Sequence, residues 1–270
     1  MSALKRLHRS LLAIGRRITS PDYLRLQVER SWSKEARALQ WFGLRDGMSV
    51  FDLGCGPGYF ARRLVDWLPN IQLMALDSDA NMLSHARAQL GDRASVVQAR
   101  VDNTGIQEHS FDFVLARLVF QHLREPLAVA TEARRLLKPG GRFVVTDIDD
   151  DLFGIVEPSV PGFTKLLARY GEAQAARGGN RRVGRTLLRL LREAGFDELE
   201  LDCIAVNSDE SGIDACFPQL DPAPLSALAA AGHLSNSEYA ELRTARKKFD
   251  AAADRFALVL LFMACGTKRV

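Results

Sequence analysis

The stretch Val50-Phe51-Asp52-Leu53-Gly54-Cys55-Gly56-Pro57-Gly58 joins an apolar run to a turn that is dense in glycine. Its valine, phenylalanine and leucine prefer β structure and indicate a buried strand. Its glycines can adopt positive φ and let the backbone approach a ligand closely. Residues 59–67 (YFARRLVDW) then have apolar side chains at helical spacing. A strand, a glycine turn and a helix start together predict a βα unit that binds a nucleotide.

One carboxylate and one missing glycine indicate which nucleotide-like ligand this turn holds. A dinucleotide site requires Gly-x-Gly-x-x-Gly, and Tyr59 stands where the third glycine belongs. Asp52 precedes the first glycine by two residues. A negative charge beside a pyrophosphate costs free energy, whereas beside an ammonium and a sulfonium it is favourable. The turn therefore favours S-adenosylmethionine over NAD, although a single glycine motif also fits a structural turn or another nucleotide site.

Composition sets bounds on the class of protein. A chain of 270 residues can form one large α/β domain with insertions. A net charge of +3 is well short of the basic surface of a protein that grips a phosphate backbone, so no nucleic-acid partner is expected. The cysteines lack paired spacing, which argues against a zinc site and a disulfide framework and fits a reducing cytoplasm: Cys55, Cys203, Cys216 and Cys265.

The first twenty residues are basic and free of acids, and their apolar core at residues 11–14 is too short for a secretory signal. We expect a solvated helix there, with an organelle-targeting segment as the alternative. No run approaches the ~18 apolar residues of a membrane span, so no membrane partner is expected.

A helical leader precedes the glycine turn. Ser20-Pro21-Asp22 is typical of a helix start, and a second helix is predicted over residues 34–42. Such a leader often covers the mouth of a cofactor site. Gln27 and Tyr23 are therefore candidates to contact the ligand, although core packing also accounts for Tyr23.

Further strands follow the turn. They are predicted over residues 71–77, 95–99, 110–116 and 142–147, with a helix over 132–137. Strands that alternate with helices predict a doubly wound parallel sheet whose ligand lies at the carboxyl ends of the strands. Asp77 ends the second strand, where a carboxylate can bind a ribose diol, while Asp79 or Ser78 caps the next helix. Met82 then packs near the adenine or in the core.

The run from Val50 to Asp147 resembles the class I S-adenosylmethionine-dependent methyltransferases in the order and spacing of its motifs: D-L-G-C-G-P-G, L-D, S-F-D-F-V and L-L-K-P-G-G-R-F. The resemblance implies a Rossmann-like, seven-stranded, mostly parallel sheet with an antiparallel final hairpin. It also implies that Asp52, Gly54, Gly56 and Gly58 form the methionine pocket and that Asp77 and Ser78 lie at the ribose. Val101 and Asp102 face the adenine, and Ala116 and Arg117 lie beside the sulfonium.

One departure from the family concerns the adenine. Members often have Gly-Asp in the turn after the third strand, whereas this chain has Ala99-Arg100. Either Asp102 replaces that acid or main-chain groups alone read the base.

The resemblance also suggests a division of the chain. Residues 1–46 form the leader, and residues 47–150, 181–206 and 254–270 form the cofactor-binding core. Residues 151–180 and 207–253 are helical insertions that select the acceptor. In the second insertion, helix starts are predicted at Asp221-Pro222 and at Ser235.

Methyl transfer is an in-line displacement that mainly requires alignment and the exclusion of water. A base is needed only for a hydroxyl or carbon acceptor, and His122 is the candidate, with hydrogen bonding to neighbouring main chain as the alternative. The acids Asp147, Asp149, Asp150 and Asp151 crowd the end of the fifth strand. Helix capping and solvation explain them without Mg²⁺, so no metal is expected.

The hypothesis that follows is a cytoplasmic methyltransferase that uses S-adenosylmethionine, releases S-adenosylhomocysteine and modifies a small organic acceptor of secondary metabolism at O, N or C. A protein or RNA methyltransferase is one alternative, because six arginines between residues 177 and 192 could bind phosphates, although a solvated helix face also explains them. A cofactor-binding module without turnover is the other alternative.

Overall fold

The computed structural model describes residues 21–152, 154–212, 222–230, 232 and 234–269. The helix expected in residues 1–20 lies outside these residues. Contacts divide the chain into two compact units. We call residues 31–149, 177–204 and 261–269 the sheet unit, and the described residues of 21–30, 150–176 and 205–260 the helical unit.

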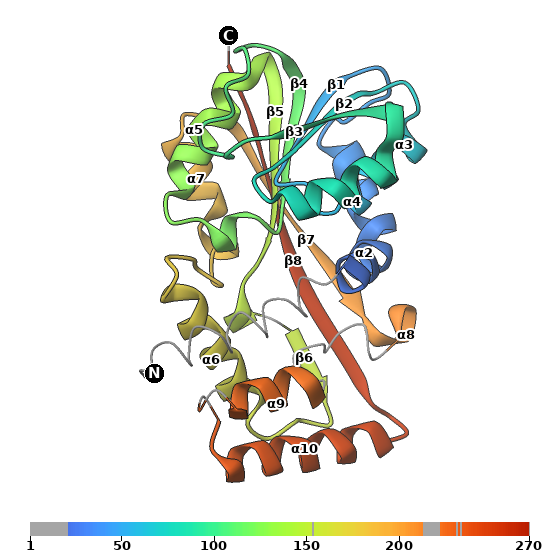
Figure 1. The fold of residues 1–270 in the computed structure, drawn as a ribbon, viewed down its shortest axis with the longest axis vertical. Coiled ribbons are helices and arrows are strands. Elements are labelled where there is room, and N and C mark those ends of the chain that lie inside the picture. The colour runs from blue at the N-terminus through green and yellow to red at the C-terminus, as the bar shows by residue number, and fades with distance from the viewer. Residues whose placement is uncertain (1–20, 153, 213–221, 231, 233, 270) are drawn as a thin grey trace. The chain divides into compact units, whose positions relative to one another are not determined.

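The sheet unit is built on parallel strands in the order β3-β2-β1-β4-β5 (Figure 1). Their bounds are Ser49–Leu53 (β1), Gln72–Asp77 (β2), Ala94–Gln98 (β3), Phe111–Arg117 (β4) and Leu137–Ile148 (β5). The register pairs Asp52 with Ala75 on one side and with Leu115 on the other. Because all five strands are parallel, their carboxyl ends meet at one edge of the sheet.

The antiparallel end of the sheet follows β5. Strand β8 (Phe256–Thr267) runs antiparallel to β5, and β7 (Asp197–Asn207) pairs with β8. The predicted fold class is confirmed, but the described residues form a sheet of eight strands. The additional strand is β6 (Gly154–Glu157), which the sequence analysis had placed in a helical insertion. It forms because the first residues of β8 extend beyond the segment that pairs with β5 and present a free edge, to which residues 154–157 pair antiparallel.

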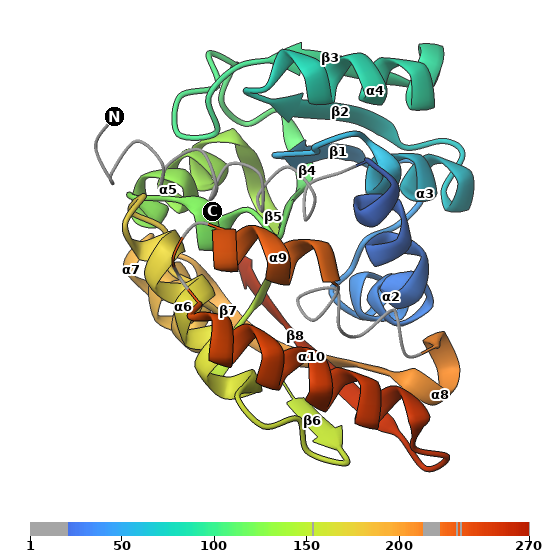
Figure 2. The ribbon, with the colours of Figure 1, turned by 60° about the horizontal axis from the view of Figure 1, so that its bottom comes forward.

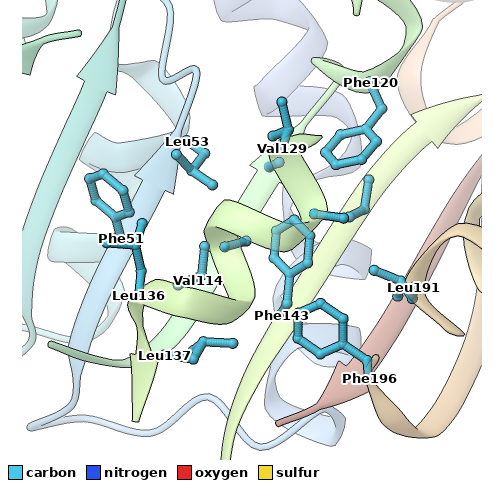
Figure 3. Packing of buried hydrophobic residues seen from close by; sticks show 14 of the residues in the cluster. Phe51, Leu53, Val114, Phe120, Val129, Leu136, Leu137, Phe143, Leu191 and Phe196 are labelled. Carbon is cyan, nitrogen blue, oxygen red and sulfur yellow. The ribbon is translucent and has the colours of Figure 1, made fainter. Parts of the chain in front are cut away.

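Helices cover the sheet unit. Helix α5 (Pro126–Leu136) packs against α7 (Leu187–Glu193), and α3 (Tyr59–Trp67) packs against α4 (Ala80–Leu90), which lies along β2 and β3 (Figure 2). The side chains of α5 and α7 share one apolar cluster with β1, β4 and β5. Figure 3 shows Phe143 of β5 beside Phe196 in this cluster, with ring centroids 5.6 Å apart.

The leader differs from its prediction. One continuous helix, α2 (Pro21–Trp41), replaces the two expected helices. Residues 22–41 contain no glycine or proline, which are the residues that disfavour a helix interior, so the helix continues through both predicted segments. Helix α5 likewise begins at Pro126, six residues before the predicted start, because proline is favoured in the first turn of a helix.

The helical unit has its own core. Helices α6 (Phe163–Ala175), α9 (Pro222–Ala230) and α10 (Asn236–Ala251) contribute to an apolar cluster that includes Phe163, Leu225 and Phe249. A short helix, α8 (Ser208–Ser211), follows β7. The helix start predicted at Ser235 is confirmed, because Ser235 and Glu238 form a reciprocal capping box. Asp221, the other predicted start, lies outside the described residues.

Candidate cofactor site

The glycine turn follows β1 directly and is held by the end of β2. The amides of Gly54 and Cys55 both donate to the carbonyl oxygen of Leu76, at 2.7 and 2.9 Å. Gly58 then has a φ of +82° and begins α3 without any side-chain cap. The strand, turn and helix expected from the sequence are therefore present.

Two glycines of this turn have different surroundings. A Cβ added to Gly58 would lie 2.9 Å from the Cα of Ala86, so this glycine is needed for the packing of α3 against α4. A Cβ added to Gly56, which has a φ of +53°, would meet nothing within 4 Å. Gly56 therefore borders open space and leaves its backbone accessible to a ligand.

Asp77 and Asp79, at the junction of β2 and α4, make different hydrogen bonds. Asp79 caps α4 by accepting the amide hydrogen of Asn81 at 2.8 Å, as expected. Asp77 accepts the amide hydrogens of Gly56 and Asp79, each at 2.9 Å and each at a different oxygen. A carboxylate has about four lone-pair positions, so Asp77 can still accept bonds from a diol. Ser78 beside it is exposed, and Met82 is half-buried in the first turn of α4.

Asp52 is the most unusual acid in the turn. It is 2% exposed, and its Oδ2 has no hydrogen-bond partner among the described residues. Burial, and to a lesser extent the charge of Asp77, raise the pKa of Asp52 to about 7, against the opposing charge of Arg117. The sequence argument treated Asp52 as a fixed negative charge, whereas burial lets it hold a proton near neutral pH.

Arg117 ends β4 and takes part in a buried network with α2. Its Nε lies 2.9 Å from Oε2 of Glu35, and its Nη2 lies 2.9 Å from Oε1 of the same carboxylate. Ser31 accepts a further bond from Nη2 at 3.1 Å and donates to Glu35. The guanidinium also lies 5.2 Å from the ring centroid of Phe60. The Glu35 side chain is fully buried and that of Arg117 is 9% exposed.

Glu35 and Ser31 were not predicted from the sequence. They lie four residues apart on α2, among Val28, Ala38 and Leu39, which are all buried. The sequence feature that could have predicted them is an acid and a hydroxyl at helical spacing on an otherwise apolar face. A buried carboxylate requires a partner, so such a pattern indicates a buried polar network.

The turn after β3 is organised by an ion pair. Arg100 donates from Nε and Nη2 to the two oxygens of Asp102, at 2.9 and 2.5 Å. Hydrogen bonding to Arg100 lowers the pKa of Asp102. Val101 packs against the apolar cluster of the sheet unit. The carboxylate of Asp102 is therefore already engaged by its neighbour in the turn.

Two acids at the carboxyl end of β5 are internal. Asp147 is completely buried and accepts the amide hydrogens of Gln121 and Ile148, at 3.0 and 2.8 Å. Burial raises the pKa of Asp147 to about 7, and the bonds from these amides oppose the shift. Asp149 is also buried and pairs with Arg185 at 2.5 and 2.6 Å. Across the described ranges, no three His, Cys, Asp or Glu side chains are arranged to hold a metal ion.

His122 lies in the 3₁₀ turn Phe120–His122, which follows β4 and is anchored through Gln121 to Asp147. The residue as a whole is exposed, and the removal of its imidazole from part of the solvent is the main cause of a lowered pKa. The charges of Arg181 and Arg177 lower the pKa of His122 further. The imidazole is therefore neutral at physiological pH. Leu118, just before this turn, has a φ of +57°, a strained conformation that is frequent near functional sites.

Two further predicted residues are Ala116 and Gln27. Ala116 is buried in the apolar cluster at the end of β4. Gln27 belongs to the helical unit, where its Nε2 donates to the hydroxyl of Tyr23 at 3.1 Å. Of the arginines between residues 177 and 192, Arg185 pairs with Asp149 and Arg181 donates to Gln121 at 3.3 Å, so this group is not simply a solvated face.

A parallel sheet with a glycine turn at the carboxyl end of β1 and an acid at the end of β2 defines the class of α/β domains that bind nucleotide cofactors. Within this class, residues 51–145 match the family model described as a methyltransferase domain. These residues belong to that family, which confirms the family predicted from the motifs.

Two of the relatives of this chain are named methyltransferases. Malonyl-acyl-carrier-protein O-methyltransferase of Hahella chejuensis is 31% identical over 37% of this chain and 36% of its own. Trans-aconitate 2-methyltransferase of Afipia carboxidovorans is 29% identical over 58% of this chain and 62% of its own. The chain thus spans less than two thirds of the length of either relative.

A solved structure shares the fold. Phosphoethanolamine N-methyltransferase 2 of Haemonchus contortus, in complex with phosphomonomethylethanolamine and S-adenosylhomocysteine, matches with a TM-score of 0.60 and 18% identity. The match covers 96% of this chain and 61% of that chain. Among the described helices of this chain, none combines the length and the apolar character that crossing a membrane requires.

Proposed function

We propose that this protein is a methyltransferase that uses S-adenosylmethionine to methylate a small organic acceptor at an O, N or C nucleophile. The observation that carries the proposal is the unpartnered Oδ2 of the buried Asp52, next to a turn in which Gly56 borders open space. A buried acceptor without a donor costs free energy. A ligand ammonium that donates to Asp52 removes this cost and favours the ionised carboxylate.

The residues of the turn fit such a cofactor. Asp52 and the glycine turn hold its methionine part, Asp77 and Ser78 lie at the ribose, and Met82 lies beside the adenine. Ala116 and Arg117 lie on the sulfonium side. The bound cofactor supplies an electrophilic methyl group, while these residues bind it, orient it and exclude water.

For the adenine, we favour reading by main-chain groups at Val101. Asp102 is the alternative, but both of its oxygens already accept bonds from Arg100. Breaking these bonds to release the carboxylate would oppose its use for the base.

The proposed acceptor is a small molecule, because one of the two named relatives is a trans-aconitate 2-methyltransferase. We further propose a role in secondary metabolism and a cytoplasmic location. His122 is the proposed acceptor-side base, since a neutral imidazole can accept a proton from a hydroxyl.

The test is to incubate the purified chain with S-adenosylmethionine and a panel of carboxylic acids, thioesters, amino acids and amino alcohols, and to measure S-adenosylhomocysteine. We expect acceptor-dependent product, and none above background from Asp52→Asn at low cofactor concentration. Cofactor binding without turnover on any acceptor would instead favour a binding module. Turnover restricted to peptide or RNA acceptors would favour the other alternative.

A further inference from the structure

A positive charge lies beside the glycine turn, where the proposed cofactor also carries positive charge. In the register of β1 and β4, Asp52 pairs with Leu115, so Arg117 follows the paired segment by two residues at the carboxyl edge of the sheet. The guanidinium lies over Phe60, in the first turn of the helix that the glycine turn begins. Arg117 is also one of the charges that act on Asp52. A bare guanidinium at this position would repel a sulfonium.

Glu35 compensates this charge. Its carboxylate binds both Nε and Nη2 of Arg117 at 2.9 Å, and its side chain has no exposed surface. Ser31 contacts both partners, so the hydroxyl holds the carboxylate and the guanidinium in one geometry. All three residues and the glycine turn belong to the sheet unit. The pair therefore belongs to the same compact unit as the turn.

The balance of charges then favours a cationic ligand. Glu35 and Arg117 together carry no net charge. The remaining acids at the turn are Asp77 and Asp52, and a cationic ligand favours the ionised form of Asp52. A buried pair is weakly screened, so removing only Glu35 leaves a positive potential that reaches the neighbouring ligand. S-adenosylmethionine has a positive sulfur, whereas S-adenosylhomocysteine has an uncharged thioether. The two ligands therefore respond differently to that potential.

We propose that Glu35 is a positioning residue that neutralises Arg117 and thereby sets the preference of the domain for the positively charged cofactor over its uncharged product. The proposal rests on the proposed function for the identity of the ligand. It assigns a role to a residue of α2 that does not itself contact the cofactor. A residue that only anchors α2 would affect both ligands alike.

The experiment measures Kd for S-adenosylmethionine and for S-adenosylhomocysteine by calorimetry, with the full chain at pH 7.5. We compare the Kd for S-adenosylmethionine divided by the Kd for S-adenosylhomocysteine. For Glu35→Gln we expect this ratio to rise at least about tenfold, because an unpaired unit charge several ångströms from the sulfonium repels it in a medium of intermediate dielectric. For Arg117→Gln we expect the ratio to fall. In the double variant, which removes both charges, we expect it to return to within about threefold of the wild-type value.

The matched control is Asp66→Asn. Asp66 lies on the exposed side of α3 and pairs with Arg62 and Arg93. This variant should leave the ratio unchanged. Equal weakening of both ligands by Glu35→Gln, or no change, would overturn the proposal. If Glu35→Gln does not fold, Arg117→Gln decides, because an unchanged or raised ratio contradicts the expected fall. If the wild-type chain binds neither ligand, the proposed function fails instead.

Discussion

Asp52 combines complete burial with a free acceptor, and both affect how stability depends on pH. Burial raises the pKa of Asp52 to about 7, whereas an unfolded aspartate titrates near 3.8. Between these values the folded chain retains a proton that the unfolded chain has lost, so stability falls as pH rises. The stabilisation from the proton on Asp52 is fully present below the pKa of the unfolded chain and is lost as pH rises above the pKa of the folded chain.

We therefore expect Asp52→Asn to flatten the decline of the unfolding midpoint between about pH 4 and pH 7 and to raise the midpoint at pH 8. Thermal unfolding at four pH values measures this. Asp147→Asn should act in the same direction, since burial also raises the pKa of Asp147. Asp66→Asn is the control, because ion pairing lowers the pKa of that exposed acid. An Asp52→Asn profile parallel to wild type would show that Asp52 titrates normally.

Asp77 and Asp79 allow binding to be separated from capping at the residue scale. Asp77→Ala should raise the Kd for S-adenosylhomocysteine at least about tenfold, because each lost charged hydrogen bond is worth about 1.5 to 3 kcal/mol. Asp79→Ala removes the cap on Asn81 and should cost about 1 kcal/mol of stability with little change in Kd. Calorimetry and thermal unfolding give the two readouts. Unchanged affinity in Asp77→Ala would remove this residue from the site.

At the scale of the element, the glycine turn serves both packing and ligand access. Gly58→Ala forces a methyl group against the backbone of Ala86 and should destabilise the fold strongly. Gly56→Ala adds a methyl group to open space, so only its positive φ costs stability, about 1 kcal/mol. We expect this variant to remain folded and to lose cofactor affinity. Midpoints of unfolding and Kd values for both variants test the distinction, and full affinity in Gly56→Ala would contradict it.

At the scale of the whole molecule, the two units should respond differently to cofactor. A ligand at 100 times its Kd stabilises the state that binds it by about 2.7 kcal/mol. Hydrogen exchange with and without S-adenosylhomocysteine should show the largest gain in protection in peptides of the sheet unit that contain the glycine turn, residues 77–82 and residues 117–122. Peptides of α6, α9 and α10 should gain less. The largest gain in those helices would place the ligand elsewhere.

Local patterns were sufficient to predict the sheet and the glycine turn. The motif from Val50 to Gly58, the acid at the end of β2 and the capping box at Ser235 each depend on residues that are neighbours along the chain. The doubly wound, parallel character of the sheet followed from alternating strands and helices, since parallel connections permit few arrangements. The leader and β6 were wrong in detail, because helix continuity and edge pairing depend on what the rest of the chain presents.

The sequence by itself determined the fold class and the methyltransferase family, because backbone preferences and motif spacing are local properties. Only the tertiary structure decided the charge of the site. Glu35 meets Arg117 across 82 residues, and the pKa of Asp52 rises because several elements bury it together. Electrostatic free energies depend on burial and on distances between remote residues, and neither quantity exists until the chain has folded.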